Sequence, residues 1–341
     1  FGKSYLNLEK YVGGKKDELR EVIINELSEE ADSEKPESYE LPALPEAVMC
    51  AAIPEWNLFE LVHRSCPSCQ KDLPEVLCDR PDGLVVCLCS QCQMIYIADT
   101  PTPNDVTKFY SRYADFKKLA PTRRGLISGL LRSYTDPHVS FLTTTGGIAK
   151  QKIADIGCAY GKFLDLVKRR GADVYGVEID QITIDALKKK KVPVCPKLSD
   201  FNIKFDVVTA FQLFEHLVDP DELVKECAAS IKQDGRLLIC VPNGLSAETV
   251  GASWVGFRVD LEHFNYFTPK SLGNLLFRHG FVIEHYWQYW QPHISREKKA
   301  RKGRCRQYLD IALSRVCASL YPEARIGNTG DYVLGVLARK I

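Results

Sequence analysis

Apolar and polar positions follow two different periods over the second half of the chain. Apolar runs of four to six residues occupy 153–156, 174–177, 205–210 and 236–241. Segments whose apolar residues recur at helical spacing cover 162–170, 181–190, 220–232 and 269–279. Strands that alternate with helices in this way predict βαβ units. We therefore expect an α/β fold, with a doubly wound, Rossmann-like parallel sheet covered by helices on both faces.

Two more apolar runs follow near the end of the chain, at residues 281–290 and 331–340. They predict two further strands with no helical crossover of the usual length between them. The segment that separates them is basic and helical in its spacing around 295–320. We expect it to be a helical insertion over about 292–328.

The first half of the chain has a different organisation. Residues 1–60 are polar and acidic and predict a lead-in or linker, with helical spacing only around 19–27. A cysteine-rich module is expected over 61–100, and a helical connector or lid over 101–150, with helices near 104–118 and 124–134. Residues 151–341 form the main domain. Phe109, Tyr110 and Tyr113 of the connector are expected to pack between the domains or to cover a neighbouring pocket.

Composition limits the class of protein. The chain has 341 residues, 45% of them apolar and 26% charged, which is typical of a globular protein of about two domains. A formal net charge of +1 disfavours nucleic-acid binding by bulk electrostatics. No apolar run approaches the roughly 20 residues that cross a bilayer, and no signal-peptide pattern begins the chain. We expect a cytoplasmic protein without a membrane partner, and the sequence leaves its oligomeric state open.

Seven of the thirteen cysteines lie between Cys50 and Cys92. Four of them form two C-x2-C pairs, with nineteen residues between the pairs: Cys66, Cys69, Cys89 and Cys92. Two such pairs bring four thiolates to one ion, so this spacing predicts a zinc ribbon in a reducing compartment. A site closed by four thiolates has no open position for water, and we expect the Zn2+ to be structural.

A glycine-rich turn, "DIGCAYG" at residues 155–161, follows the first apolar run of the main domain. In a doubly wound sheet such a turn lies at the ligand-binding edge. Its spacing matches neither the G-x-G-x-x-G dinucleotide fingerprint nor a Walker turn. Asp155 would repel a phosphate but would attract an ammonium group, so the ligand is expected to present a cation here.

The turn resembles the first motif of class I S-adenosylmethionine-dependent methyltransferases, which has the form acidic-x-Gly-x-x-x-Gly. The resemblance extends from about residue 152 to residue 341 and includes the reversed last strand of that family. It implies that Glu178 holds the ribose hydroxyls and that Asp200 and Phe201 contact the adenine. The implied cofactor-binding set is Asp155, Gly157, Cys158, Ala159, Gly161, Glu178, Asp200, Phe201, Phe211 and Gln212.

The loop "FQLFEHLVDP", with "LEHFNYFTPKSL" further on, resembles the branch that contains ubiquinone-biosynthesis O-methyltransferases. Small-RNA 2′-O-methyltransferases have a similar Glu-His pair and bind a divalent metal with it. Gln212 replaces one of their glutamates, so Glu215, His216 and His263 would form an incomplete metal site. His216 or His263 is our candidate for the general base, with Glu215 as its partner, because a neutral imidazole titrates near working pH. Capping of the loop is the structural alternative for these residues.

A four-cysteine ribbon before such a domain resembles a family associated with sugar and natural-product tailoring. Sugar C-methyltransferases of that group continue into a further domain, whereas this chain ends about where the sheet does, so we expect O-methylation of a sugar or other small molecule. Basic runs at 188–191 and 296–306 keep RNA or a carrier-linked substrate as an alternative, although such runs are usually solvated. A non-catalytic module that binds S-adenosylmethionine is the second alternative.

Overall fold

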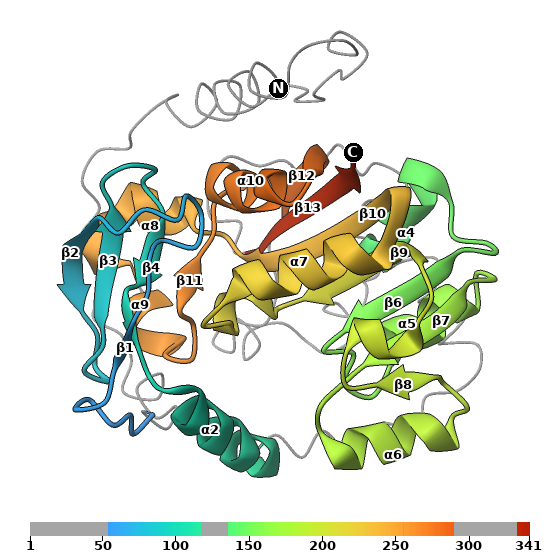
Figure 1. The fold of residues 1–341 in the computed structure, drawn as a ribbon, viewed down its shortest axis with the longest axis horizontal. Helices are drawn as coiled ribbons and strands as arrows, with labels where there is room; N and C mark the ends of the chain where they lie inside the picture. The colour runs from blue at the N-terminus through green and yellow to red at the C-terminus, as the bar shows by residue number, and fades with distance from the viewer. Residues whose placement is uncertain (1–53, 117–135, 255, 290–332) are drawn as a thin grey trace, which may run out of the picture.

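The computed structural model describes residues 54–116, 136–254, 256–289 and 333–341. The main sheet has seven strands in the order β12-β13-β10-β9-β6-β7-β8 (Figure 1). β6 to β10 pair in parallel where they are neighbours, and β13 runs antiparallel to both β10 and β12. The predicted Rossmann-like sheet and its reversed last strand are confirmed. Its strands are β6 (Lys152–Ile156), β7 (Asp173–Val177), β8 (Val194–Cys195), β9 (Phe205–Phe211), β10 (Ile231–Pro242), β12 (Phe281–Tyr289) and β13 (Val333–Lys340).

Successive residues of the central strands enter two different cores. Ile153 of β6 and Val207 of β9 pack in one core, while Ala154 and Val208 pack in the other. This period of two buries both faces of the sheet, as expected for parallel strands covered by helices. Residues of α4 (Pro137–Gly146), α5 (Lys162–Lys168) and α6 (Gln181–Lys189) line the first core, and residues of α7 (Pro220–Ser230) and α10 (Pro269–Arg278) line the second.

The helices begin where the sequence supplies caps. Asp180, Asp219 and Thr268 each accept a hydrogen bond from a backbone N–H of the first turn that follows. β10 begins earlier than predicted, at Ile231, which already pairs with Phe205 before the register shifts. The predicted helix over 220–232 therefore ends at Ser230.

A second, smaller sheet lies beside the first and has the order β11-β4-β3-β2 (Figure 1). Its first three strands along the chain come from the cysteine-rich segment, and β11 follows α9, far along the chain. β1 pairs with β5 before helix α2 begins. The bounds are β1 (Val62–His63), β2 (Pro74–Asp79), β3 (Val85–Cys89), β4 (Ile95–Ile97), β5 (Asp99–Thr100), β11 (Asn265–Tyr266), α2 (Pro103–Phe116), α8 (Leu245–Val250) and α9 (Gly256–Val259).

Residues of the small sheet belong to two hydrophobic clusters, and each cluster also contains residues from later parts of the chain. Leu84 and Val86 pack in one cluster with Trp254, Phe257 and other residues that follow β10. The cysteines of the same segment pack in the cluster that also contains apolar residues of α10. The ribbon segment is thus held between parts of the chain that follow it by about 150 residues or more.

Several sequence expectations fall on residues that the structure does not describe. They are the lead-in before residue 54, the helix near 124–134 and the insertion over about 292–328 with its basic run. Among the described residues, no helix combines the length and apolar character that crossing a membrane requires.

Candidate active site

Asp155 lies near the end of β6 and is almost fully buried, at 3% exposure. Its Oδ1 accepts a hydrogen bond of 2.7 Å from the Thr209 hydroxyl on the neighbouring strand. Burial raises the pKa of the Asp155 carboxyl to about 7, because the charged form loses its hydration. This carboxyl therefore changes its charge near neutral pH, which makes it sensitive to a cationic ligand.

The turn after β6 is built from left-handed backbone. Gly157, Ala159 and Gly161 all have positive φ, at 66°, 45° and 69°. At Gly161 a side chain would also be obstructed, since a Cβ there would lie 2.8 Å from the Leu187 side chain. Cys158 is buried beneath the turn. The structure thus places the backbone of the predicted residues at the turn, with the Cys158 thiol turned into the core.

Glu178 directly follows β7 and closes the same edge of the sheet. Its Oε2 accepts a hydrogen bond of 3.0 Å from the Ala159 backbone N–H, and its Oε1 accepts one of 2.8 Å from Ile179 N–H. The carboxylate is therefore fixed against the glycine turn by backbone donors. Oε1 also accepts a hydrogen bond of 3.2 Å from Asp180 N–H, so Oε2 is the oxygen that keeps a lone pair for a further donor, such as a hydroxyl.

The predicted adenine contacts lie in a short 3-10 helix, η3 (Leu198–Phe201). Asp200 is exposed, and its Oδ2 accepts a hydrogen bond from the Lys197 backbone N–H. The half-buried Phe201 ring packs edge-on against Tyr175 and Phe205, with centroid distances of 5.3 and 5.8 Å. Asp200 is thus held within its own loop, whereas Phe201 is held against residues of β7 and β9.

Phe211 ends β9, and its ring centroid lies 4.6 Å from that of His138 and 4.8 Å from that of Phe163. Gln212 follows with a positive φ of 52°. His138, on the first turn of α4, also lowers the pKa of Asp155, which opposes part of the effect of burial. Sequence reasoning missed His138 because it treated residues 101–150 as a connector. The Asp136-Pro137 start of a helix is the signal that could have placed His138 beside the turn.

Glu215, His216 and His263 come together, although 46 positions separate the two parts of the sequence that carry the histidines. Glu215 and His216 lie in the 3-10 helix η4 (Phe214–His216), and His263 precedes β11. The imidazole centroids are 4.7 Å apart, and His216 Nε2 lies 3.8 Å from Glu215 Oε1. The structure thus brings all three predicted residues together, with Glu215 and His263 buried and His216 half-buried.

Backbone contacts hold this group together. His216 Nδ1 lies 3.1 Å from the Glu262 carbonyl oxygen, and Phe264 N–H donates to the Glu215 carbonyl at 2.7 Å. Tyr110 of α2 places its ring edge-on to His216, with the centroids 5.9 Å apart. The connector therefore reaches the histidine pair through Tyr110.

Glu215 is fully buried, and neither carboxylate oxygen has a hydrogen-bond partner within the described residues. Burial raises the pKa of Glu215 well above its usual range, and the negative charges of Asp260 and Glu262 add to this effect. One ligand atom from each member of the group lies within 4.8 Å of the others. One carboxylate and two imidazoles at this spacing have the chemistry of a transition-metal site, so the residues fit a divalent cation.

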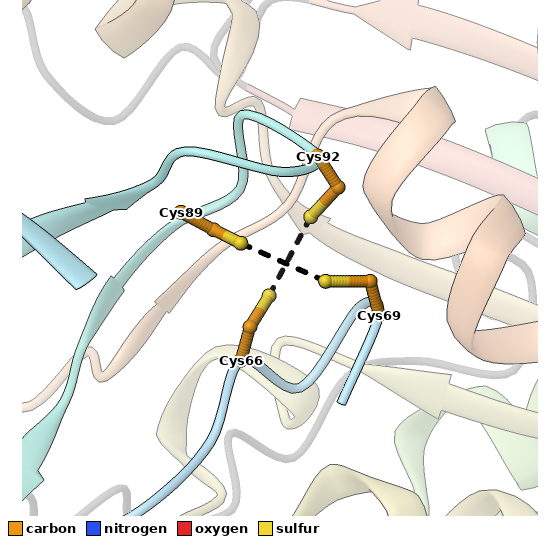
Figure 2. A group of neighbouring side chains, drawn as sticks. All are labelled: Cys66, Cys69, Cys89 and Cys92. Carbon is orange, nitrogen blue, oxygen red and sulfur yellow. Dashed lines mark hydrogen bonds between the residues drawn. The ribbon is translucent and has the colours of Figure 1, made fainter. Parts of the chain in front are cut away.

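The four predicted cysteine ligands converge on one point, as Figure 2 shows. The sulfur atoms of Cys66 and Cys92 are 3.5 Å apart, and those of Cys69 and Cys89 are 3.6 Å apart. Tetrahedral zinc with Zn–S bonds of about 2.3 Å requires S–S distances of about 3.8 Å. Burial raises the pKa of the Cys69 thiol to about 11, an effect that a bound cation reverses. The geometry fits a four-thiolate zinc site.

Comparison with known proteins identifies a stretch of somewhat less than half of the chain. Residues 128–286 match a family described as "Methyltransferase domain". The chain contains a methyltransferase domain. The match includes the glycine turn, Glu178, Glu215, His216 and His263, and the four cysteines lie outside it.

Relatives of the methyltransferase domain include ubiquinone biosynthesis O-methyltransferases. The one from Acinetobacter baylyi is 24% identical over 164 residues, which are 43% of this chain and 64% of that protein. The one from Bradyrhizobium diazoefficiens is 29% identical over 188 residues, 50% of this chain and 73% of that protein. The chain spans between about half and two thirds of the length of the first curated relatives it matches.

A solved structure with a similar chain course is the magnesium protoporphyrin IX methyltransferase of Synechocystis. It is 14% identical, with a TM-score of 0.43, and covers 69% of this chain and 95% of its own. The fold of the methyltransferase domain in this chain is defined by its strand order and by its reversed last strand.

Proposed function

We propose that the protein transfers a methyl group from S-adenosylmethionine to a hydroxyl of a small molecule, either a sugar or a natural product. The observation that carries this proposal is the edge of the sheet where Asp155, the glycine turn and Glu178 meet within a methyltransferase domain. In a doubly wound sheet this edge is where ligands bind. Glu215 and His216 belong to the loop that follows β9, the strand next to β6 in the sheet.

In this proposal the donor lies across the ends of β6, β7 and β9. Asp155 attracts the ammonium group of the methionine part, and Glu178 accepts hydrogen bonds from the ribose hydroxyls. Asp200 and Phe201 contact the adenine, and Phe211 and Gln212 line the approach to the sulfonium. Support comes from the anchored Glu178 carboxylate and from the raised pKa of Asp155, which an adjacent cation would lower again.

A histidine removes the proton of the acceptor hydroxyl as its oxygen attacks the methyl carbon, while the S–CH3 bond breaks and S-adenosylhomocysteine leaves. A carbonyl oxygen can only accept a hydrogen bond, so the Glu262 contact keeps the proton on His216 Nδ1 and makes Nε2 the basic nitrogen. Glu215 Oε1 lies 3.8 Å from Nε2 and can pair with the imidazolium that forms. His263, 4.7 Å from His216 between ring centroids, is the second candidate for the base.

A divalent cation at Glu215, His216 and His263 is a second candidate for how the hydroxyl is activated. The buried Glu215 carboxylate favours it, since neither oxygen accepts a hydrogen bond within the described residues. When bound, such a cation would acidify a coordinated hydroxyl. Treatment of the protein with a chelator, followed by addition of Mg2+ or Mn2+, separates the two mechanisms. Activity that survives the chelator supports the histidine base alone.

We further propose a division of the chain into three parts. Residues 61–100 bind one structural zinc ion, and residues 101–150 connect this segment to the main domain and cover its pocket. Residues 151–341 carry the transfer reaction. A zinc site with four thiolates has no open position at which to bind substrate. Its contribution would be to fold a short segment that has little core of its own.

Turnover of labelled S-adenosylmethionine against three acceptor pools tests the proposed function. The pools are sugar nucleotides, small phenols and total RNA. Label in the first or second pool supports the proposal. Label in RNA alone would favour the RNA reading, and cofactor binding without turnover would favour a binding module.

A further inference from the structure

Two arginines of the ribbon segment extend into the loops that carry the candidate catalytic group. Arg64 lies two positions before Cys66, and Arg80 directly follows β2. The Arg80 side chain has 0% exposure, as does that of Asp82, with which it forms an ion pair. Neither arginine belongs to the predicted active site, and both donate mainly to atoms outside residues 61–100.

Arg80 binds the loop that contains His263. Its Nη1 donates a hydrogen bond of 2.6 Å to the His263 carbonyl itself, and its Nη2 donates to the Leu261 carbonyl. A short loop without strand pairing needs donors for its buried carbonyl groups. Arg80 supplies two of them, so the position of the His263 backbone depends on the ribbon.

The orientation of Arg80 is fixed from behind. Asp82 Oδ1 accepts from Nε at 3.0 Å and Asp82 Oδ2 accepts from Nη2 at 2.5 Å, which is a two-point contact with the guanidinium. Trp56 Nε1 in turn donates to Asp82 Oδ2 at 2.8 Å. The Arg80 guanidinium is therefore held in one orientation, with Nη1 directed at the His263 carbonyl.

Arg64 connects the other loop to the same segment. Its Nη1 donates at 2.6 Å to the carbonyl of Val218, two residues after His216. Its Nη2 donates at 2.8 Å to the carbonyl of Phe264, the residue after His263. One guanidinium thus binds the backbone just after each of the two histidines.

We propose that Arg64 and Arg80 are positioning residues, through which the ribbon sets the placement of His216 relative to His263. This rests on the proposed function for its catalytic meaning. Only a planar, five-donor guanidinium can make these divergent contacts at once, and a lysine ammonium at the same place cannot. The ribbon then contributes to the active site by positioning its histidines, although it holds no candidate catalytic residue.

Histidine-labelled full-length protein tests the proposal directly, because the chain has only seven histidines whose ring signals can be followed by NMR. The variant is Arg80→Lys. The matched control is Arg278→Lys, since Arg278 also joins the ribbon to the domain, through the carbonyls of Ser68 and Pro67, but lies next to His279. We expect Arg80→Lys to shift the signals of His216 and His263, and Arg278→Lys to shift that of His279 alone.

Unchanged His216 and His263 signals in Arg80→Lys, or equal shifts of both in Arg278→Lys, would overturn the proposal. If Arg80→Lys does not keep its fold, Asp82→Asn is measured in its place under the same criterion. With an acceptor in hand, Arg80→Lys should lower kcat by about 10- to 100-fold with KM for S-adenosylmethionine unchanged. The NMR result requires no turnover, so it decides the positioning role even if the proposed methyl transfer fails.

Discussion

At the scale of single residues, Asp155 carries a carboxyl group whose charge changes near neutral pH. Its pKa is raised to about 7 by burial, so its protonated form stabilises the free protein below pH about 3.9, and this contribution is lost as the pH rises through 7. A ligand ammonium has the opposite preference, for the carboxylate. Affinity for S-adenosylhomocysteine should therefore rise about tenfold from pH 6 to pH 8, by the Henderson–Hasselbalch fraction for this pKa.

Calorimetric titration of the wild type and of Asp155→Asn at pH 6, 7 and 8 checks this expectation. The amide cannot ionise, so the variant should bind more weakly at pH 8 and show little pH dependence. Thr209→Val, which removes the hydroxyl donor to Asp155, is the matched control and should move the midpoint to higher pH. A wild type with no pH dependence between 6 and 8 would contradict the assigned role of Asp155.

The histidine pair leads to a second prediction at the residue scale. His216→Asn should lower kcat by about 10²- to 10⁴-fold if this imidazole is the general base, and His263→Asn by the same amount if the base is His263. KM for S-adenosylmethionine should change little. His63→Asn, on the exposed strand β1, is the control and should retain the wild-type rate. Full activity in both active-site variants would rule out the histidine base.

At the scale of elements, the end of β10 packs closely against β11. Gly244 follows Asn243, and a Cβ at Gly244 would lie 2.7 Å from the Phe267 carbonyl oxygen and closer still to that of Tyr266. Backbone atoms cannot move aside as a side chain can. Gly244→Ala should therefore lower the free energy of unfolding by about 1–3 kcal/mol, as overpacking does.

Denaturant unfolding of Gly244→Ala measures this loss, with Gly251→Ala as the comparison. A Cβ at Gly251 meets open space, and its φ of 69° with ψ of −147° leaves only the cost of a backbone conformation that is nearly restricted to glycine, about 1–3 kcal/mol. In the Gly244 variant, hydrogen exchange at Asn265 and Tyr266 should also speed up. Unchanged exchange there would mean that β11 does not depend on this contact.

Local patterns predicted the main sheet well, because strands such as β6 and β9 are apolar runs bounded by turn residues. The four-cysteine group was predicted for a similar reason, since the spacing of its cysteines is a local pattern. The glycine turn and the Glu215-His216 pair were found for the same reason. The pairing of β11 with β4 and the contacts of Arg80 had no such signal. They join residues more than 150 positions apart, and such contacts depend on tertiary packing that no periodicity of the chain records.

At the scale of the whole molecule, the ribbon and the methyltransferase domain share two hydrophobic clusters. Loss of the zinc site should therefore destabilise both parts together. We expect Cys66→Ser/Cys92→Ser to lose about one zinc ion per chain and to melt in one transition, lowered by about 10 °C or more. Scanning calorimetry with metal analysis provides both readings.

Cys78→Ser is the control for that variant, since Cys78 lies in the same segment but outside the four-cysteine group. It should keep its zinc and most of its thermal stability. Two separate transitions in the double variant, with the larger one at the wild-type temperature, would show that the ribbon and the domain unfold independently.

Binding of the cofactor product tests the central claim most directly. Titration of the full chain with S-adenosylhomocysteine should give one site per chain, with affinity much reduced in Glu178→Ala because the ribose loses its carboxylate partner. NAD should produce no comparable heat, since the turn lacks the dinucleotide spacing. Tight binding of NAD with no binding of S-adenosylhomocysteine would contradict the account.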